Sequence, residues 1–177
     1  PCTMIQGYGQ TEGMTMTFLS QEDHQRAIAG DHPERLGSCG REGFVSEILV
    51  VDPDGNPVPR DGNAAGEIIV RSEANMLGYW RRPDLTEKTL RDGWMWTGDI
   101  ATWDDEGYVF IVDRAKDMII SGGENIYSTQ VEAAIHQHPA VLESAVFGIP
   151  DDTWGEAVKA VVVLKPGQTA TEADIIS

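Results

Sequence analysis

Short hydrophobic runs separated by turn-forming residues fill much of the first two thirds of the chain. Their length and their β-branched and aromatic content are typical of strands. The runs are Ile48–Val51, Glu67–Arg71, Trp94–Trp103 and Tyr108–Val112. Residues 52–55 (Asp-Pro-Asp-Gly) form a turn after the first run, and residues 104–107 link the last two runs as a hairpin. We therefore expect residues 35–112 to form a mainly antiparallel sheet or a distorted barrel, with a short helix at residues 84–91 that has Asp84 as its N-cap.

After Arg114 the pattern becomes mixed. Val131, Ala134 and Ile135 have the 3/4 spacing of one helix face. The predicted elements are a strand at Met118–Ser121, a turn at Gly122-Gly123, a helix from about Thr129 to His138 capped by Ser128, and strands at Glu143–Ile149 and Ala157–Leu164. The whole chain is therefore predicted to be α+β and β-rich: a distorted antiparallel β-barrel-like subdomain, then a compact α+β unit, with the boundary at residues 113–117.

The composition of the chain limits the kinds of molecule that it can bind as a main partner. The chain has 177 residues, with 13 Lys and Arg against 29 Asp and Glu, and a net charge of −16. This length allows one ordinary domain or two small ones. The acidic balance argues against a nucleic-acid backbone or an anionic membrane as the main partner, because both require clustered Lys and Arg. No apolar run reaches the roughly 18 residues of a membrane span, and no charged leader precedes an apolar stretch.

The two cysteines, Cys2 and Cys39, are too few and too isolated for a disulfide framework. No CxxC pair or His/Cys cluster indicates a zinc site. We expect two reduced thiols in a cytoplasmic protein.

Both ends of the chain have unusual features. The first residue is Pro1 rather than Met, and the chain stops at Ser177, just after Thr171 and Asp174, whose spacing is that of a capping box that opens a helix. We therefore expect the chain to be a fragment of a longer protein.

The first candidate site is a glycine-rich segment, residues 7–13 (Gly-Tyr-Gly-Gln-Thr-Glu-Gly). Glycines let the backbone approach a ligand closely. The aromatic ring, hydroxyl and carboxylate between them can stack on a base, bind a phosphate and hold Mg²⁺ through oxygen. On this segment alone, a surface turn with incidental polar residues is the favoured interpretation, because glycine-rich loops are common.

Two further segments carry polar residues beside strand-like runs. Asp99 follows Thr97-Gly98, and a carboxylate at such a position can accept hydrogen bonds from a ribose diol. Asp113 and Arg114 adjoin the predicted boundary, where the guanidinium can contact ribose or phosphate. Taken separately, each also fits a structural role, as a turn aspartate and a surface ion pair.

Together these segments resemble the adenylate-forming superfamily, which includes acyl- and aryl-CoA ligases, peptide-synthetase adenylation domains and beetle luciferases. The matches occur in the order found in that family and cover nearly the whole chain. They are Tyr8-Gly9-Gln10-Thr11-Glu12 for Y-G-x-T-E, Gly66–Arg71 for G-E-I-x-V-[RK], Trp94–Asp99 for [WF]-x-x-T-G-D, and Asp113–Ile126 for D-R-x-K-[DE]-x-I-x-x-x-G-x-x-[IV].

The resemblance implies a binding role for each matching residue of a nucleotide site. Tyr8 would stack on adenine, and Asp99 would bind the ribose hydroxyls with help from Arg114. The residues that shape the pocket around the nucleotide would be Gly7, Gly9 and Gln10 on the wall that carries Tyr8, and Ile111 on the other side.

The resemblance also implies catalytic roles. Thr11 would contact the α-phosphate of ATP, and Glu12 would help to hold Mg²⁺. Lys116 is at the hinge position, and Gly123 is in the loop that lines the tunnel for the pantetheine arm of coenzyme A.

The implied domain organisation has three parts. Residues 1–113 would be the C-terminal part of the large domain, residues 114–117 the hinge, and residues 118–177 a truncated C-terminal lid domain. The family's upstream phosphate loop and its late catalytic lysine in a Gly-Lys context are absent from this sequence. We therefore expect these residues alone to be inactive and to associate into homo-oligomers through uncovered apolar surface.

The implied activity is acid–thiol ligation. The enzyme would activate a fatty or aromatic carboxylic acid with ATP and Mg²⁺ as acyl-AMP and transfer it to coenzyme A, with one active site serving both reactions through domain rotation. Residues 119–127 most resemble medium- and long-chain or aromatic acid CoA ligases, and so indicate fatty acid metabolism. Two alternatives stay open at this point: an adenylation domain that loads a carrier protein, and a non-catalytic folding or interaction module.

Overall fold

A computed structural model describes residues 3–176 of the chain, so Cys2 lies outside the described residues. The chain divides into two compact units, one that runs up to Ile111 and one that starts at Val112.

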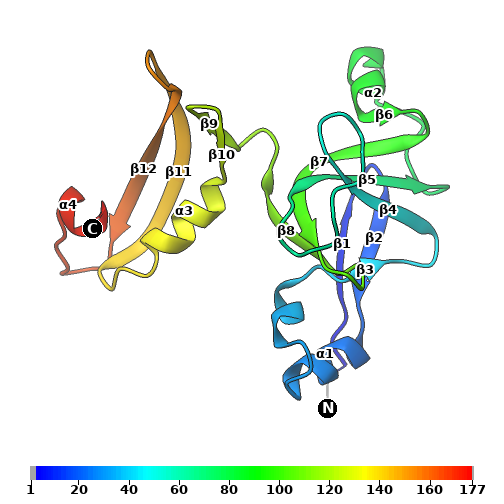
Figure 1. Ribbon diagram of the computed structural model, residues 1–177, viewed down its shortest axis with the longest axis horizontal. Helices are drawn as coiled ribbons and strands as arrows, with labels where there is room; N and C mark the ends of the chain where they lie inside the picture. Colours follow the sequence, from blue (N-terminus) through cyan, green and yellow to red (C-terminus); the bar gives the residue numbers. More distant parts are fainter. Residues whose placement is uncertain (1–2, 177) are drawn as a thin grey trace. The chain divides into compact units, whose positions relative to one another are not determined.

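Two antiparallel sheets build the first unit (Figure 1). The smaller sheet has the strand order β1-β2-β3, with bounds Gln6–Gln10, Met14–Leu19 and Arg41–Glu42. The larger sheet has the order β4-β5-β7-β6, and β8 also pairs with β7. Its strands are Ser46–Val51, Gly66–Ser72, Trp94–Trp103, Leu90–Arg91 and Val109–Arg114 for β4, β5, β7, β6 and β8. The prediction of a β-rich fold built on a curled antiparallel sheet is confirmed.

Alternating side chains of these strands form the core of the first unit. Met16 of β2, and Cys39 in the segment that leads into β3, pack with buried residues of the larger sheet. The other members are Ile48, Val50, Ile68, Val70, Met95, Ala101, Trp103 and Val109. Because one face of each strand is buried here, register is fixed by the side chains that point inward.

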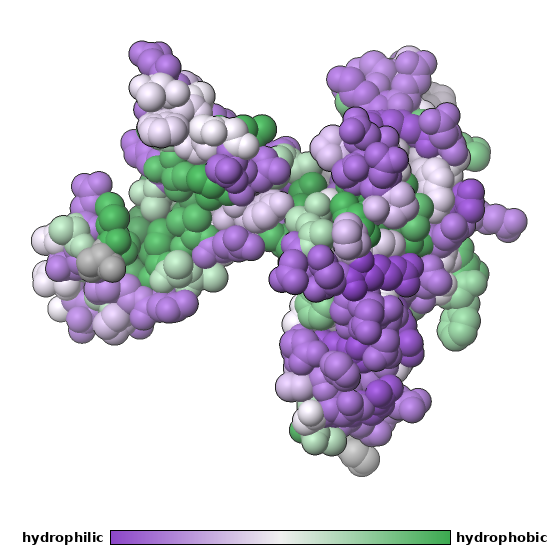
Figure 2. All heavy atoms as spheres, viewed as in Figure 1, coloured by the Kyte–Doolittle hydropathy of each residue, from purple (hydrophilic) through white to green (hydrophobic). Residues whose placement is uncertain are grey.

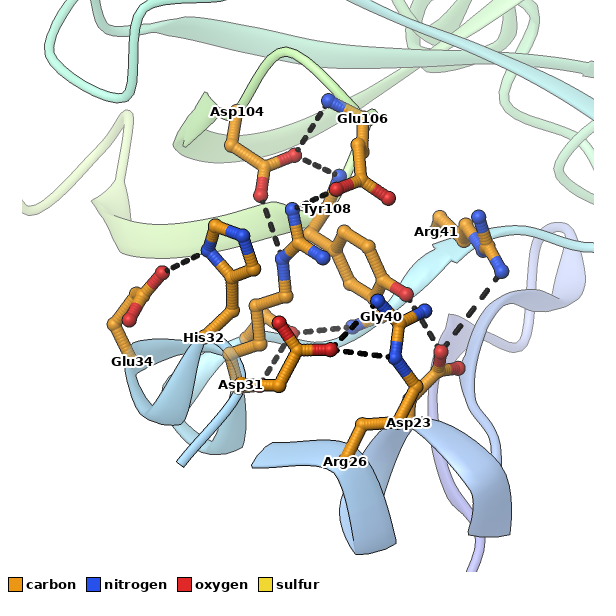
Figure 3. A network of polar contacts seen from close by, with 12 residues as sticks. Asp23, Arg26, Asp31, His32, Glu34, Gly40, Arg41, Asp104, Glu106 and Tyr108 are labelled. Carbon is orange, nitrogen blue, oxygen red and sulfur yellow. Dashed lines mark hydrogen bonds and ion pairs between the residues drawn. The ribbon is translucent and has the colours of Figure 1, made fainter. Parts of the chain in front are cut away.

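A polar network fastens helix α1 (Gln21–Ile28) to the loop that joins β7 to β8 (Figure 3). The Tyr108 hydroxyl donates to Asp23 Oδ1 at 2.6 Å, and Asp23 also forms the capping box of α1 with Ser20. Arg35, in the 3₁₀ helix η1 (Pro33–Gly37), donates to Asp104 at 2.9 Å. Its guanidinium carbon lies 4.1 Å from the centroid of the Tyr108 ring. These contacts lie in a part of the sequence for which no motif predicted a role.

The second unit is a four-stranded antiparallel sheet with strand order β10-β9-β12-β11, and helix α3 lies along it (Figure 1). The strands are Ile119–Ser121, Glu124–Ile126, Val141–Asp151 and Gly155–Leu164 for β9 to β12, and the helices are Ser128–Ile135 (α3) and Glu172–Ile176 (α4). Ile119, Ile135, Val141 and Val146 form its core. The compact α+β unit predicted after Arg114 is therefore present.

Hydrophobic residues are not confined to the cores. In the view of Figure 2 they gather on the second unit over the β11–β12 hairpin. Phe147, Val161 and Val163 of this hairpin are among the large hydrophobic residues that stay exposed, as are Leu77 and Trp80 in the first unit. None of the helices described in residues 3–176 combines the length and apolar character that a membrane crossing requires.

Two predicted helix starts were wrong. Helix α2 (Pro83–Thr89) begins after Arg82, and Asp84 lies inside its first turn, where its carboxylate pairs with the Arg82 guanidinium at 2.7 Å. Pro83 sets this start, because its fixed φ suits the first helical position.

Helix α3 begins after Tyr127 rather than after Ser128. The Ser128 hydroxyl donates to Asp113 Oδ2 at 2.8 Å instead of capping the helix. The helix ends at Ile135, three residues before the predicted end at His138, because a turn of the chain there leads directly into β11.

The glycine-rich segment is also not the loop that its sequence predicts. Residues Gln6–Gln10 form strand β1, and residues 11–13 form a tight turn into β2. A register irregularity between Tyr8 and Gly9 marks the pairing of β1 with β2. A Cβ on Gly9 would lie 2.0 Å from the backbone oxygen of Met14. This close approach of two backbones explains the glycine within a strand.

Candidate functional site

Asp99 is the centre of the candidate site. It lies on β7 and is buried, with 7% of its surface exposed. The Tyr8 hydroxyl donates to Asp99 Oδ2 at 2.7 Å, and Gln10 Nε2 donates to the same oxygen at 2.9 Å. Gln10 Nε2 also lies 2.9 Å from the Thr97 carbonyl oxygen. Strand β1 of the smaller sheet therefore holds the carboxylate of a strand in the larger sheet.

The hydroxyl of Tyr8 keeps its proton at ordinary pH. Burial raises its pKa most, and the hydrogen bond to Asp99 raises it further. The proton therefore stays on Tyr8, and the bond to the Asp99 carboxylate persists wherever that carboxylate is charged. This bond fixes the direction of the aromatic ring.

The backbone around Asp99 departs from regular strand geometry. Gly98 has a φ of +75°, and its N–H donates to Glu67 Oε1 of β5 at 2.9 Å. The pairing of β5 with β7 shifts register between Glu67 and Ile69. Thr97 Oγ1 donates to the Ile68 carbonyl at 2.8 Å and accepts from the Asp99 N–H at 3.2 Å. Such an irregularity re-aims a side chain, and here the side chain concerned is that of Asp99.

Glu67 is therefore a partly buried acid that supports Asp99 through the backbone. Burial raises the pKa of Glu67, the nearby Asp99 charge adds to this, and the Gly98 N–H and Arg91 oppose it.

Thr11 and Glu12 lie in the turn that follows β1. Thr11 is exposed and Glu12 is half-buried. Glu12 Oε1 accepts from the Tyr79 hydroxyl at 2.8 Å, and the Glu12 carbonyl accepts from the Met76 N–H at 2.6 Å. A segment more than sixty residues away in sequence therefore anchors this turn.

The carboxylates of the structure bear on the Mg²⁺ site that the sequence implies. Within residues 3–176, no group of three or more His, Cys, Asp or Glu side chains can enclose a metal ion. Mg²⁺ typically binds to one or two carboxylates and completes its shell with substrate phosphates and water. A single half-buried carboxylate such as Glu12 fits that mode of binding.

Four further predicted site residues lie outside strands β1 and β7. Ile111 is on β8 and 44% exposed, and Arg114 is the last residue of that strand. Lys116 lies in the turn after β8 and is 71% exposed at its side chain, with Asp117 Oδ1 4.0 Å from its Nζ. Gly123 has a φ of +87° in the β9–β10 turn. Their roles toward a nucleotide or thiol stay predictions.

Sequence reasoning brought Tyr8, Gln10 and Asp99 together but missed three supporting residues: Glu67, Thr97 and Tyr79. The first two lie within quoted motifs, and a charged or hydroxyl residue inside an otherwise hydrophobic strand was the available signal. Tyr79 gave no such signal, because no sequence pattern links it with Glu12, which is 67 residues away along the chain.

The sequence matches the family described as AMP-binding enzyme over residues 1–80 and the AMP-binding enzyme C-terminal domain over residues 130–177. The chain belongs to the family of AMP-binding enzymes. The two matched regions lie in the first and second units of the structure, respectively. The recognition made from the motifs is thereby confirmed.

Similar members of the family are CoA ligases. A feruloyl-CoA synthase of Amycolatopsis is 45% identical over 163 residues, which is 92% of this chain and 31% of that protein. A medium/long-chain fatty acid–CoA ligase of Mycobacterium tuberculosis is 43% identical over 171 residues, or 96% of this chain and 28% of that protein.

The fold also matches solved structures of the family. The o-succinylbenzoate CoA synthetase of Bacillus subtilis, in complex with its acyl-adenylate intermediate, superimposes with a TM-score of 0.79 at 36% identity. The match covers 94% of this chain and 32% of that protein. The chain thus spans about a third of the length of the curated relatives that it matches.

Proposed function

We propose that these residues belong to a longer acid–thiol ligase that uses ATP to activate a carboxylic acid. In the first reaction the carboxylate attacks the α-phosphorus of ATP, the bond to the β-phosphate oxygen breaks, and acyl-AMP and pyrophosphate form. In the second reaction the thiol of coenzyme A attacks the acyl carbonyl, loses its proton and releases AMP. The observation that carries this proposal is the Tyr8–Asp99–Gln10 cluster in a chain of the AMP-binding family.

The cluster is suited to a nucleoside. A buried carboxylate can accept two hydrogen bonds from a ribose diol, and Asp99 is already oriented by two donors. Preorganisation of this kind lowers the cost of ordering the site when ligand binds. The ring of Tyr8, fixed through its hydroxyl, offers a flat face for adenine. Arg114 and Ile111 are proposed to complete the site from β8.

The turn after β1 is suited to phosphate. The Thr11 hydroxyl can donate to an α-phosphate oxygen, where negative charge increases during the attack. Glu12 is the residue that would hold Mg²⁺, which supplies a positive charge for the phosphate oxygens when it is bound. Both residues directly follow β1, the strand that carries Tyr8 and Gln10.

The second unit is proposed to act as a lid that rotates between the two reactions, with residues 114–117 as the hinge. The Arg114 carbonyl accepts from the N–H groups of Asp117 and Met118 at 3.0 and 3.1 Å, so this segment is a compact turn. Rotation about a few residues is the ordinary way for one site to serve two reactions. Gly123, in the β9–β10 turn, is proposed to line the path of the pantetheine arm.

The acid is proposed to be aromatic or fatty, because the two relatives described above act on feruloyl and medium- to long-chain fatty groups, respectively. Coenzyme A is the proposed thiol for the same reason. We place the reaction in the cytoplasm, and we propose that the 177-residue chain alone is inactive.

ATP–pyrophosphate exchange by the longer ligase tests this proposal directly. A panel of aromatic and fatty acids should include at least one that supports exchange, and the replacement Asp99→Ala should abolish it. Thioester formation is then compared with coenzyme A, a pantetheine-bearing carrier protein and a primary amine as acceptors. Absence of exchange with every acid would reject adenylation, whereas exchange with transfer only to the carrier protein or the amine would reject coenzyme A as the acceptor.

A further inference from the structure

Tyr79 makes a contact that the proposed function does not use. Its hydroxyl donates to Glu12 Oε1 at 2.8 Å, and the bond spans 67 residues of sequence. Three residues before it, the Met76 N–H donates to the Glu12 carbonyl at 2.6 Å. One segment therefore holds both the backbone and the side chain of Glu12.

The segment that carries Tyr79 is itself fixed. The Tyr79 N–H donates to Thr86 Oγ1 at 2.9 Å, and the Thr86 hydroxyl donates to the Arg82 carbonyl at 3.0 Å. Gly78 has a φ of +149°, and a Cβ there would lie 2.8 Å from Cγ2 of Thr86. Helix α2 therefore sets the position of the Tyr79 backbone.

The contact makes the two carboxylate oxygens of Glu12 different from each other. Oε1 accepts from Tyr79, and within residues 3–176 Oε2 accepts no hydrogen bond. A free glutamate side chain loses rotamer entropy when it binds a ligand, and a side chain already held in one rotamer loses less.

We propose that Tyr79 is a positioning residue that fixes the Glu12 carboxylate, so that Oε2 is presented to the divalent cation that accompanies ATP. Partners of this kind, one contact removed from the metal, orient the ligand side chain, and their loss typically costs about 10–100-fold in metal affinity. This inference rests on the proposed function, because it assumes that Glu12 holds the cation.

The test is Tyr79→Phe in the longer ligase, which removes only the hydroxyl. We expect the Mg²⁺ concentration for half-maximal ATP–pyrophosphate exchange to rise about tenfold, at the lower end of the range for such partners. Binding of Mn²⁺ in the presence of ATP, measured by electron paramagnetic resonance, should weaken by a similar factor. Binding of AMP without metal should stay unchanged, because Tyr8 and Asp99 are untouched.

Tyr108→Phe is the matched control. It also removes a tyrosine hydroxyl from a carboxylate, here Asp23 at 2.6 Å, but outside the candidate site. It should leave the Mg²⁺ and Mn²⁺ dependence unchanged. Thr86→Val is the second variant, and it should shift the metal dependence in the same direction as Tyr79→Phe by releasing the Tyr79 backbone.

Two results would overturn the positioning role. One is a Mg²⁺ requirement in Tyr79→Phe within twofold of the unmodified enzyme, with Mn²⁺ binding equally unchanged. The other is a loss of metal-free AMP binding as large as the loss of Mn²⁺ binding, which would indicate a general disturbance of the fold. Failure of the proposed function is distinguishable, because the unmodified ligase would then show no exchange with any acid.

Discussion

The Tyr8 hydroxyl and Asp99 Oδ2 are joined by a hydrogen bond of 2.7 Å across 91 residues of sequence. This bond, with that from Gln10, ties β1 of the smaller sheet to β7 of the larger one. The carboxylate is therefore oriented by the position of one short strand. Substitutions in β1 that change its backbone or its hydrogen-bond donors should therefore alter the orientation of the Asp99 carboxylate while Asp99 itself is kept.

Gln10→Met tests how much the orientation of Asp99 contributes to AMP binding, because it removes an orienting donor and keeps the aspartate. Methionine keeps the length of the side chain but removes the donor that reaches both Asp99 Oδ2 and the Thr97 carbonyl. Hydrogen bonds to charged groups contribute about 1.5–3 kcal/mol, so AMP should bind roughly tenfold more weakly to the longer ligase. Isothermal titration calorimetry with AMP measures this change.

Gln6→Met is the matched control on the same strand. Gln6 Nε2 donates to the Ser38 carbonyl at 3.0 Å rather than to Asp99. Its replacement should lower stability slightly and leave AMP affinity unchanged. Equal loss of affinity in the two variants would show that only the general stability of β1 matters.

Gly9→Ala should disrupt the β1–β2 hairpin. The new Cβ would lie 2.0 Å from the Met14 carbonyl oxygen, which is a backbone atom and cannot move away alone. Overpacking of this kind costs about 1–3 kcal/mol, occasionally more. Urea unfolding should therefore show a loss of at least about 2 kcal/mol.

A second glycine provides the comparison for that variant. Gly37 has no atom within 4 Å of a Cβ built on it, so Gly37→Ala should leave the urea midpoint nearly unchanged. A Gly9→Ala protein as stable as Gly37→Ala would contradict the close packing of β1 against β2.

The strands of the larger sheet were predictable because their hydrophobic residues carry the signal themselves. The runs around Ile48, Ile68 and Trp96 all became strands of that sheet. Strand β1 was not predicted, because glycine has low strand propensity. Gly9 is present in this strand because the backbone of β2 lies too close for a side chain. The local sequence pattern around Gly9 gives no information about this contact with β2.

The candidate site was predictable as far as its motifs reached. Tyr8, Gln10 and Asp99 were identified through family resemblance, and the structure adds how they contact one another. The bond between Glu12 and Tyr79 depends on how a loop closes over a turn, so only the folded chain shows it. Helix boundaries at Ser128 and Asp84 were misplaced because tertiary contacts and Pro83, respectively, outweighed local capping preference.

Glu67→Gln should change the pH dependence of stability. Burial raises the pKa of Glu67 above its ordinary value of 4.5. Between that value and the folded pKa, the folded state binds more protons than the unfolded state, so the free energy of unfolding falls as pH rises. Glutamine does not titrate. The stability of Glu67→Gln relative to the unmodified chain should therefore increase with pH through this window and level off above it.

Thermal unfolding from pH 4 upward measures this difference. Glu73→Gln, which replaces an exposed glutamate just after β5, should give a curve parallel to that of the unmodified chain. A Glu67→Gln curve that is also parallel would show that Glu67 has the same pKa in both states.

Asp23→Asn should show the opposite dependence on pH. Although burial works to raise the pKa of Asp23, hydrogen bonds from Tyr108 and Ser20 outweigh it and lower the pKa below its ordinary value of 3.8. The stability from this carboxylate is therefore present above pH 3.8 and lost as pH falls through the folded pKa. At neutral pH the replacement should cost about 1.5–3 kcal/mol.

The loss caused by Asp23→Asn should shrink as the medium becomes acidic, which urea unfolding at several pH values measures. Asp105→Asn, at an exposed hairpin position, should have little effect at any pH. A constant difference between Asp23→Asn and the unmodified chain would rule out the role given to the charged carboxylate.

Lys116→Pro in the longer ligase tests the proposed hinge. A hinge residue must change φ or ψ between two domain orientations, and proline fixes φ near −65° and restricts the residue before it. The turn bonds from Asp117 and Met118 to the Arg114 carbonyl do not use the Lys116 N–H, but they need a helical conformation at residue 115, which a following proline disfavours. Adenylate formation should therefore survive better than thioester formation, by about tenfold or more, because one fixed φ suits only one orientation.

Pyrophosphate exchange and single-turnover thioester formation from preformed acyl-adenylate should be measured on the same preparation. Lys116→Ala serves as the control, because it removes the exposed charge but leaves the backbone free to rotate. We expect it to affect both half-reactions equally and only slightly. If Lys116→Pro also slowed both half-reactions by the same factor while circular dichroism showed an intact fold, Lys116 would be a surface residue rather than the pivot.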